Sequence, residues 1–128
     1  MYLEVKDLVK YYNEDSPIIK KLNFSVKKGE IISFIGESGS GKTTFLKCIS
    51  GLEKINSGMI SLNDKILNNG SIFVKPQDRK IGFVFQDYPL FPHLNLKENV
   101  TFNLKNKYFK KFDYMIALTG LQDLLYRY

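Results

Sequence analysis

The sequence predicts an α/β fold, and three observations point to this class. Two short runs, 31–35 and 81–85, are nearly all apolar, which is typical of strands that a parallel sheet buries on both faces. A glycine-rich loop, 36–41, follows the first run. Residues 42–50 then carry apolar side chains at helical spacing. A strand, a glycine loop and a helix in this order indicate a helix packed against a parallel sheet.

Two strand-like segments, 2–9 and 18–26, precede this unit. Between them, residues 13–17 read Asn-Glu-Asp-Ser-Pro, which is turn chemistry. Residues 28–30, Lys-Gly-Glu, then turn the chain into the run 31–35. We therefore expect two strands before the unit of strand, glycine loop and helix.

The helix after the loop is expected to end at Gly51, because apolar side chains share one face up to Leu52 and glycine commonly terminates helices. Beyond it, we expect one short strand at 58–62. Turn or loop chemistry then marks the segments 63–64, 68–70 and 76–79.

Two helices are expected in the last third of the chain. Residues 87–93 contain two prolines and should form a loop. Asn95 can cap a helix that begins at Leu96, and Glu98 three residues further on comes close to a capping box. The remaining expectations are a helix at 108–119, a glycine stop at 120, and a short apolar turn or helix at 121–128.

The composition fits a soluble globular domain. A chain of 128 residues makes one small domain or part of a larger one, and 44% hydrophobic with 25% charged residues argues against disorder. No apolar run reaches transmembrane length, and the first residues lack the layout of a signal peptide. Cys48 is the only cysteine, so no intrachain disulfide is possible. This suits the cytosol, and we expect Cys48 to pack as a small helix residue.

The net charge of +6 comes from basic residues that are spread along the chain. Spread charge is typical of a solvated surface rather than of a nucleic-acid interface, so we expect no nucleic-acid partner. A basic surface also suits docking near an anionic cytoplasmic membrane face. The residues concerned are Lys20, Lys21, Lys27, Lys28, Arg79, Lys80, Lys105, Lys107, Lys110 and Lys111.

The glycine loop has the complete spacing of a phosphate-binding loop, or P-loop. Its glycines permit positive φ, so that successive N–H groups and the N-terminus of the next helix converge on an anion. Lys42 would reach the β- and γ-phosphates, and the Thr43 hydroxyl would coordinate Mg²⁺. We therefore expect ATP or a close relative to bind with Mg²⁺ at Gly36, Glu37, Ser38, Gly39, Ser40, Gly41, Lys42 and Thr43.

Essentially the whole chain resembles the N-terminal half of an ATP-binding-cassette (ABC) transporter ATPase. The resemblance is carried by 28–31, 48–53 and 57–60, and most specifically by 79–94, Arg-Lys-Ile-Gly-Phe-Val-Phe-Gln-Asp-Tyr-Pro-Leu-Phe-Pro-His-Leu. This last segment looks like the Q-loop region of importer ATPases of the ferric-iron, molybdate, sulfate and polyamine type. The resemblance implies a partial P-loop NTPase (RecA-like) core with an antiparallel β subdomain built from 2–26 and neighbouring strands.

The resemblance implies roles for three further residues. Gln86 matches the Q-loop glutamine, which contacts Mg²⁺ and the attacking water and moves with the transmembrane subunit. Tyr12 matches the aromatic residue that stacks on adenine, with Tyr11 as the alternative. Thr44 matches a residue that helps to hold the α-phosphate. His93 cannot be the family's switch histidine, which lies much later in relatives, so we expect a loop residue near the transporter-facing surface.

The sequence contains the Walker A loop and the Q-loop but no signature motif, Walker B aspartate, catalytic glutamate or switch histidine. We therefore expect residues 1–128 to be an incomplete ABC ATP-binding domain whose C-terminal part is absent. Such a chain keeps the phosphate cradle but lacks the carboxylate that activates water, so we expect no turnover by the chain alone. A fragment, a truncated gene and one half of a split protein are the alternatives that would explain it.

The resemblance implies the ATP-binding portion of a transporter ATPase that powers solute import. Its partners would be transmembrane permease subunits and, in the full-length form, a second ATPase subunit, with the protein cytoplasmic and peripheral on the inner face of the cell membrane. Exposed Tyr88, Leu90 and Phe91 within 86–94 would face the permease. The alternative is a non-catalytic nucleotide-binding or interaction module, and the Gln86 region disfavours another P-loop enzyme such as a kinase.

Overall fold

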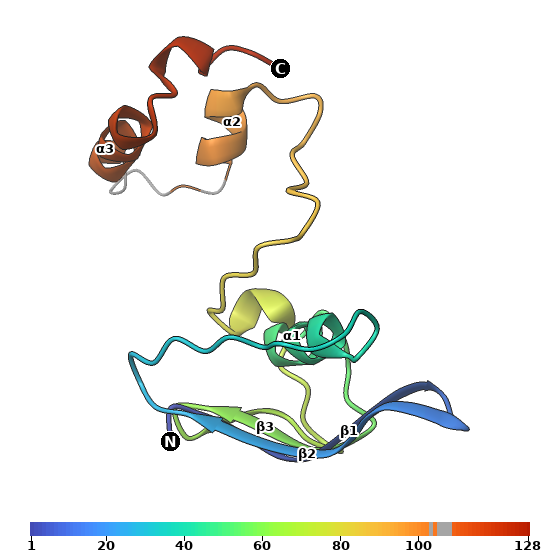
Figure 1. The fold of residues 1–128 in the computed structure, drawn as a ribbon. Helices are drawn as coiled ribbons and strands as arrows, with labels where there is room; N and C mark the ends of the chain where they lie inside the picture. The colour runs from blue at the N-terminus through green and yellow to red at the C-terminus, as the bar shows by residue number, and fades with distance from the viewer. Residues whose placement is uncertain (103, 105–108) are drawn as a thin grey trace. The chain divides into compact units, whose positions relative to one another are not determined.

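The computed structural model describes residues 1–102, 104 and 109–128. These residues form two compact units, Met1–Phe83 and Val84–Tyr128 (Figure 1). None of the described helices is long and apolar enough to span a membrane.

An antiparallel sheet of four strands, in the order β2-β1-β3-β4, forms the base of the first unit. β1 (Leu3–Asn13) pairs with β2 (Ser16–Val26) after a turn at 14–15, and on its other side with β3 (Ser57–Leu62). Both long strands extend further than the sequence pattern predicts. The expected antiparallel β subdomain is confirmed.

The strand β4 (Lys65–Asn68) is an element that the sequence pattern does not predict. It pairs with β3 across Asn63 and Asp64, whose φ values of 49° and 61° lie in the left-handed region. Two successive residues in this conformation make a tight hairpin turn whose twist matches the strands, and Asn and Asp tolerate it best after glycine. The predicted turn at 63–64 was therefore the available signal for this hairpin.

The helix α1 (Lys42–Ser50) lies over one face of this sheet (Figure 1) and has the predicted bounds. It ends at Gly51, whose φ of 85° is left-handed and whose N–H donates to the carbonyl of Cys48. Burial raises the pKa of the Cys48 thiol to about 11, so the thiol stays neutral at physiological pH and acts as a packing residue. The helix closes a core formed by Val5, Leu8, Ile19, Phe45, Cys48, Ile60 and Leu67.

The two apolar runs do not form the predicted buried strands. In the described chain, 31–35 and 81–85 have no strand assignment and belong to no sheet. Ile31 and Ile35 are each 96% exposed, and Val84 is 82% exposed. A strand buried on both faces needs strands on either side for its N–H and C=O groups, and helices above and below for its side chains. Neither run has that environment here, so Ile31, Ile35 and Val84 lie at the surface, whereas Ile81 is half-buried against the core.

Residues 76–79 contain a single 3-10 turn, η1 (Pro76–Asp78), where the sequence indicates a loop. Arg79 directly follows it and is only 3% exposed. The expectation that Arg79 belongs to a solvated basic surface is therefore wrong. The physical reason is that backbone carbonyls, rather than water, surround its guanidinium group.

The second unit begins with the predicted loop and the short helix α2 (Leu96–Thr101). Asn95 accepts a hydrogen bond from the N–H of Glu98 at 2.9 Å through its side chain. The carboxylate of Glu98 in turn accepts from the N–H of Asn95 at 2.9 Å. The capping box that the sequence suggests is confirmed, and it satisfies two donors at the start of the helix.

The helix α3 (Phe109–Thr119) matches the second predicted helix, except that Tyr108 lies outside the described residues. Gly120 follows it with a φ of 66°, and the last segment contains a 3-10 turn, η3 (Gln122–Leu124). The chain then returns to α2. The first N–H groups of that helix donate to the carbonyls of Leu125 and Arg127, both at 2.9 Å.

Candidate nucleotide-phosphate site

The glycine loop, residues 36–41, leads directly into α1. Gly39 and Gly41 have φ values of 82° and 89°, in the left-handed region that glycine adopts without strain. Gly41 is also required by space, because a Cβ there would lie 2.9 Å from Cγ2 of Ile18. Since Gly41 is the N-cap of α1, no capping side chain occupies the first N–H groups of the helix. Those groups are open to an anion at the helix N-terminus.

The ammonium group of Lys42 lies over this loop. Its Nζ donates to the carbonyl of Gly36 at 2.7 Å, to the carbonyl of Glu37 at 2.6 Å and to the hydroxyl of Ser40 at 3.0 Å. These contacts use the three donors of the ammonium group and hold the lysine at the loop. The structure therefore brings the predicted cation and the predicted loop together, while the phosphate contact itself stays a prediction.

Thr43 and Thr44 occupy the first turn of α1, where the hydroxyl of Thr43 is predicted to bind Mg²⁺. Thr43 is exposed and Thr44 is half-buried. Among the described residues, no three His, Cys, Asp or Glu side chains come together as a metal site. This donor set suits Mg²⁺ bound mainly through nucleotide phosphates and water, for which one or two protein oxygens suffice.

A cavity of about 280 Å³ lies beside the loop. Ser40 and Lys42 line it on the loop side. Its apolar wall includes Phe24, Phe34 and Phe45, whose ring centroids lie 5.3 to 5.5 Å apart. An apolar wall next to a cationic loop suits a ligand that has both an anionic and an apolar part.

Tyr12, the predicted adenine-stacking residue, lies near the end of β1 in the same unit and is 56% exposed. Lys10 holds its Nζ 4.7 Å from the centroid of the Tyr12 ring. That Nζ is itself fixed by the carbonyl of Lys54 at 2.9 Å and by the carboxylate of Glu53 at 3.1 Å. Tyr11 is half-buried. Tyr12 therefore offers the more accessible ring of the two alternatives.

Gln86 and His93 both belong to the second unit. Gln86 lies in a turn and is exposed, so its side chain is free of the protein core. His93 is exposed beside Phe91, with ring centroids 5.9 Å apart. The structure thus agrees with a loop position for His93, and the contact of Gln86 with Mg²⁺ stays a prediction.

Sequence reasoning misses three residues that support the site. Ile18 packs against Gly41, Lys10 lies against Tyr12, and Arg79 binds the far end of α1. In the sequence, Arg79 precedes an apolar run and begins the segment 79–94, but neither feature distinguishes a buried guanidinium group from a surface one. Contacts between distant segments of the chain decide these roles.

A curled glycine loop with a lysine over it, at the start of a helix packed on a sheet, defines a P-loop nucleoside-triphosphate-binding protein. Comparison with known families shows to which family of P-loop proteins the chain belongs. The profile of the family described as ABC transporter matches residues 19–128, and the chain belongs to this family.

Curated relatives of this chain are ATP-binding proteins of importers. The chain is 40% identical to the maltose/maltodextrin import ATP-binding protein MalK of Aliivibrio fischeri, over 96% of this chain and 34% of that protein. It is 39% identical to the sn-glycerol-3-phosphate import ATP-binding protein UgpC of Rhizobium meliloti, over 82% of this chain and 29% of that protein. The chain therefore spans about a third of the length of these relatives.

Solved ABC cassettes share the fold. CbiO1 of Clostridium perfringens, described as part of the ABC transporter complex cbiONQ, matches with a TM-score of 0.74 and 27% identity, over 98% of this chain and 53% of that one. The cassette MJ0796, in a dimeric post-hydrolysis state bound to ADP and Pi, matches with a TM-score of 0.77 and 27% identity, over 97% and 60%.

Proposed function

We propose that the chain is the ATP-binding portion of an importer ATPase and that it binds ATP with Mg²⁺ at the glycine loop. The observation that supports this best is the geometry of Lys42, whose Nζ is held at the loop by three oxygens 2.6 to 3.0 Å away. Gly39 and Gly41 in left-handed conformations give the backbone its phosphate-binding curl. The names of the relatives, which are import ATP-binding proteins, support the transport role.

In this proposal, residues 1–128 are an incomplete ABC ATP-binding domain that contains the Walker A loop and the Q-loop. Gly36 to Thr44 hold the phosphates, Thr43 and Gln86 contact Mg²⁺, and Gln86 orients the attacking water. In its full-length form the ATPase pairs with a second ATPase subunit and with permease subunits, on the inner face of the cell membrane. The solute is left open, since the named relatives import maltose, maltodextrin or sn-glycerol-3-phosphate.

Tyr12 is expected to supply the adenine contact. Replacing Tyr12 with alanine should weaken ATP binding by about 0.5–1.5 kcal/mol, the range for an aromatic stacking pair, whereas phenylalanine should preserve it. Calorimetric titration of the two variants with Mg-ATP measures this difference. Tyr11→Ala is the matched control: a loss of affinity in Tyr11→Ala with none in Tyr12→Ala would move the stacking role to Tyr11.

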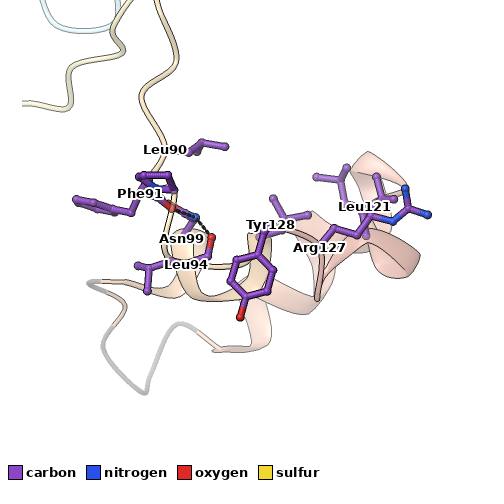
Figure 2. Close-up of a pocket in the computed structure, with 10 residues that line it drawn as sticks. Leu90, Phe91, Leu94, Asn99, Leu121, Arg127 and Tyr128 are labelled. Carbon is purple, nitrogen blue, oxygen red and sulfur yellow. Dashed lines mark hydrogen bonds between the residues drawn. The ribbon is translucent and has the colours of Figure 1, made fainter.

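The second unit carries an apolar groove of about 340 Å³ that suits the permease contact (Figure 2). Asn99 braces one wall, since its side chain accepts from the N–H of Phe91 at 2.8 Å and donates to the carbonyls of Phe91 and Leu94 at 3.1 and 2.8 Å. Tyr88, Leu90 and Phe91 are 76%, 65% and 45% exposed, as a contact surface requires. Leu121, Leu124 and Tyr128 line the groove from the end of the chain.

A serine at Leu90 is expected to weaken the permease contact, because it removes an exposed apolar side chain from the groove. The amount of chain retained on membranes that contain co-expressed permease subunits measures this. Leu118→Ser is the matched control, since Leu118 is 66% exposed on α3 and does not line the groove. Equal retention of both variants, or a larger loss for Leu118→Ser, would rule out the groove as the contact surface.

A further inference from the structure

Arg79 binds the C-terminal end of α1 from a buried position. The residue is 3% exposed, and its guanidinium carbon lies 5.2 Å from the ring centroid of Phe73. The group donates hydrogen bonds to carbonyls of three separate segments. The acceptors are the carbonyls of Ile49 at 2.7 Å and Cys48 at 2.9 Å at the end of α1, of Val74 at 2.8 Å, and of Leu67 at 3.4 Å on β4.

The partners of Arg79 are carbonyl groups rather than a carboxylate. Ion pairs among the described residues join Lys6 with Glu4 and Lys10 with Glu53, and Arg79 takes part in neither. The negative end of the α1 dipole therefore supplies the opposite charge. Burial lowers the pKa of Arg79, although a guanidinium group keeps its proton at neutral pH. A full positive charge thus lies against the last carbonyls of the helix that begins at the glycine loop.

Gly51 leaves the space that Arg79 occupies. A Cβ at position 51 would lie 2.5 Å from Nε and 2.7 Å from Cζ of Arg79. The glycine that ends α1 is thus required both for its left-handed φ of 85° and for the passage of the arginine. The C-terminal end of α1 and the guanidinium group of Arg79 are therefore sterically complementary.

Arg79 contacts the C-terminal end of the same helix whose N-terminal end forms the predicted phosphate site. α1 is a nine-residue helix whose N-terminus carries Lys42 and the open N–H groups. A short helix behaves as a stiff rod, so fixing its last carbonyls to β4 and to the segment before η1 also fixes the direction of its first N–H groups. We propose that Arg79 is a positioning residue that aligns α1 for phosphate binding. This inference rests on the proposed nucleotide-binding function.

Inorganic triphosphate with Mg²⁺ is the probe for this role, because it tests the phosphate cradle without the base contact. Its affinity for the full chain is measured by calorimetry, alongside the melting temperature of each variant. Arg79→Met is expected to lower the affinity by about threefold to tenfold, since it keeps the side-chain length and removes every donor. The triphosphate affinity of Arg79→Lys is expected to lie between those of Arg79→Met and the original chain. The ammonium group of lysine is a point charge and cannot bridge three segments as the planar guanidinium group of arginine does.

Ile116→Ala is the matched control, since Ile116 is buried on α3 in the second unit, whereas the loop and Arg79 belong to the first unit. It should lower the melting temperature and leave triphosphate affinity unchanged. If Arg79→Met does not fold, Arg79→Lys carries the test alone. Triphosphate affinity in Arg79→Lys equal to that of the original chain would overturn the positioning role. An original chain that binds no triphosphate would instead overturn the nucleotide site, and the positioning role with it.

Discussion

Replacing Lys42 with alanine is expected to lower the affinity of the chain for Mg-ATP between about tenfold and a hundredfold. The basis is the loss of a charge-assisted hydrogen bond to phosphate, worth roughly 1.5–3 kcal/mol. The Nζ of Lys42 donates to oxygens of Gly36, Glu37 and Ser40 at the loop, so a phosphate oxygen would replace at least one of these acceptors on binding. Calorimetric titration with Mg-ATP measures the change directly.

Lys47→Ala is the matched control for this variant. Lys47 lies on the same helix but in its last turn, away from the loop. Its removal changes the net charge of the chain by the same amount and should leave ATP affinity nearly unchanged. Equal affinities of Lys42→Ala and the original chain, or equal losses in the two variants, would show that the loop lysine makes no specific phosphate contact.

Local chemistry explains why several elements were predictable from the sequence. α1 has the predicted bounds because a glycine starts it, a glycine ends it, and Phe45 and Cys48 face the core in between. The capping box of Asn95 and Glu98 likewise depends only on residues three apart. Such elements carry their own signals. The hairpin of β3 and β4 also had a local sequence signal, the pair Asn63 and Asp64, which adopts the left-handed conformation in the structure. The four residues of β4 are too few to show a strand pattern on their own.

Long-range contacts explain what could not be predicted. Ile31 and Ile35 belong to a run whose composition suits a strand buried on both faces, but composition cannot supply the neighbouring strands. Arg79 shows the same limit at the site, because its partners come from segments up to 31 residues away in the sequence. The spacing of the glycine loop indicated where the loop and its lysine lie in the sequence, while the contact of Lys42 with phosphate stays a prediction. It held no information on what fixes the other end of the helix.

The purified 128-residue chain is expected to bind Mg-ATP without sustained hydrolysis. The sequence has no Asp or Glu after a later apolar strand to act as the water-activating base. Positioned general-base assistance typically contributes roughly 10²–10⁴-fold in rate, so phosphate release should fall at least that far below the rate of a complete cassette. The amide of Gln86 is neutral and has no basic site, so it cannot take a proton from water in place of a carboxylate. Phosphate release with Mg-ATP, measured over many equivalents of protein, gives the rate.

Lys42→Ala is the control for this assay, because any contaminating ATPase would be unaffected by the substitution. The size of the protein is followed by light scattering in the same samples, since Ile31 and Ile35 at 96% exposure and Val84 at 82% leave apolar side chains open to self-association. We expect species larger than a monomer. Phosphate release from them should be slow because the general base is absent, and not because ATP fails to bind. Calorimetry on the same samples tests whether ATP binds. Steady turnover from a well-behaved monomer, lost in Lys42→Ala, would mean that the residues present in this chain already suffice to activate water.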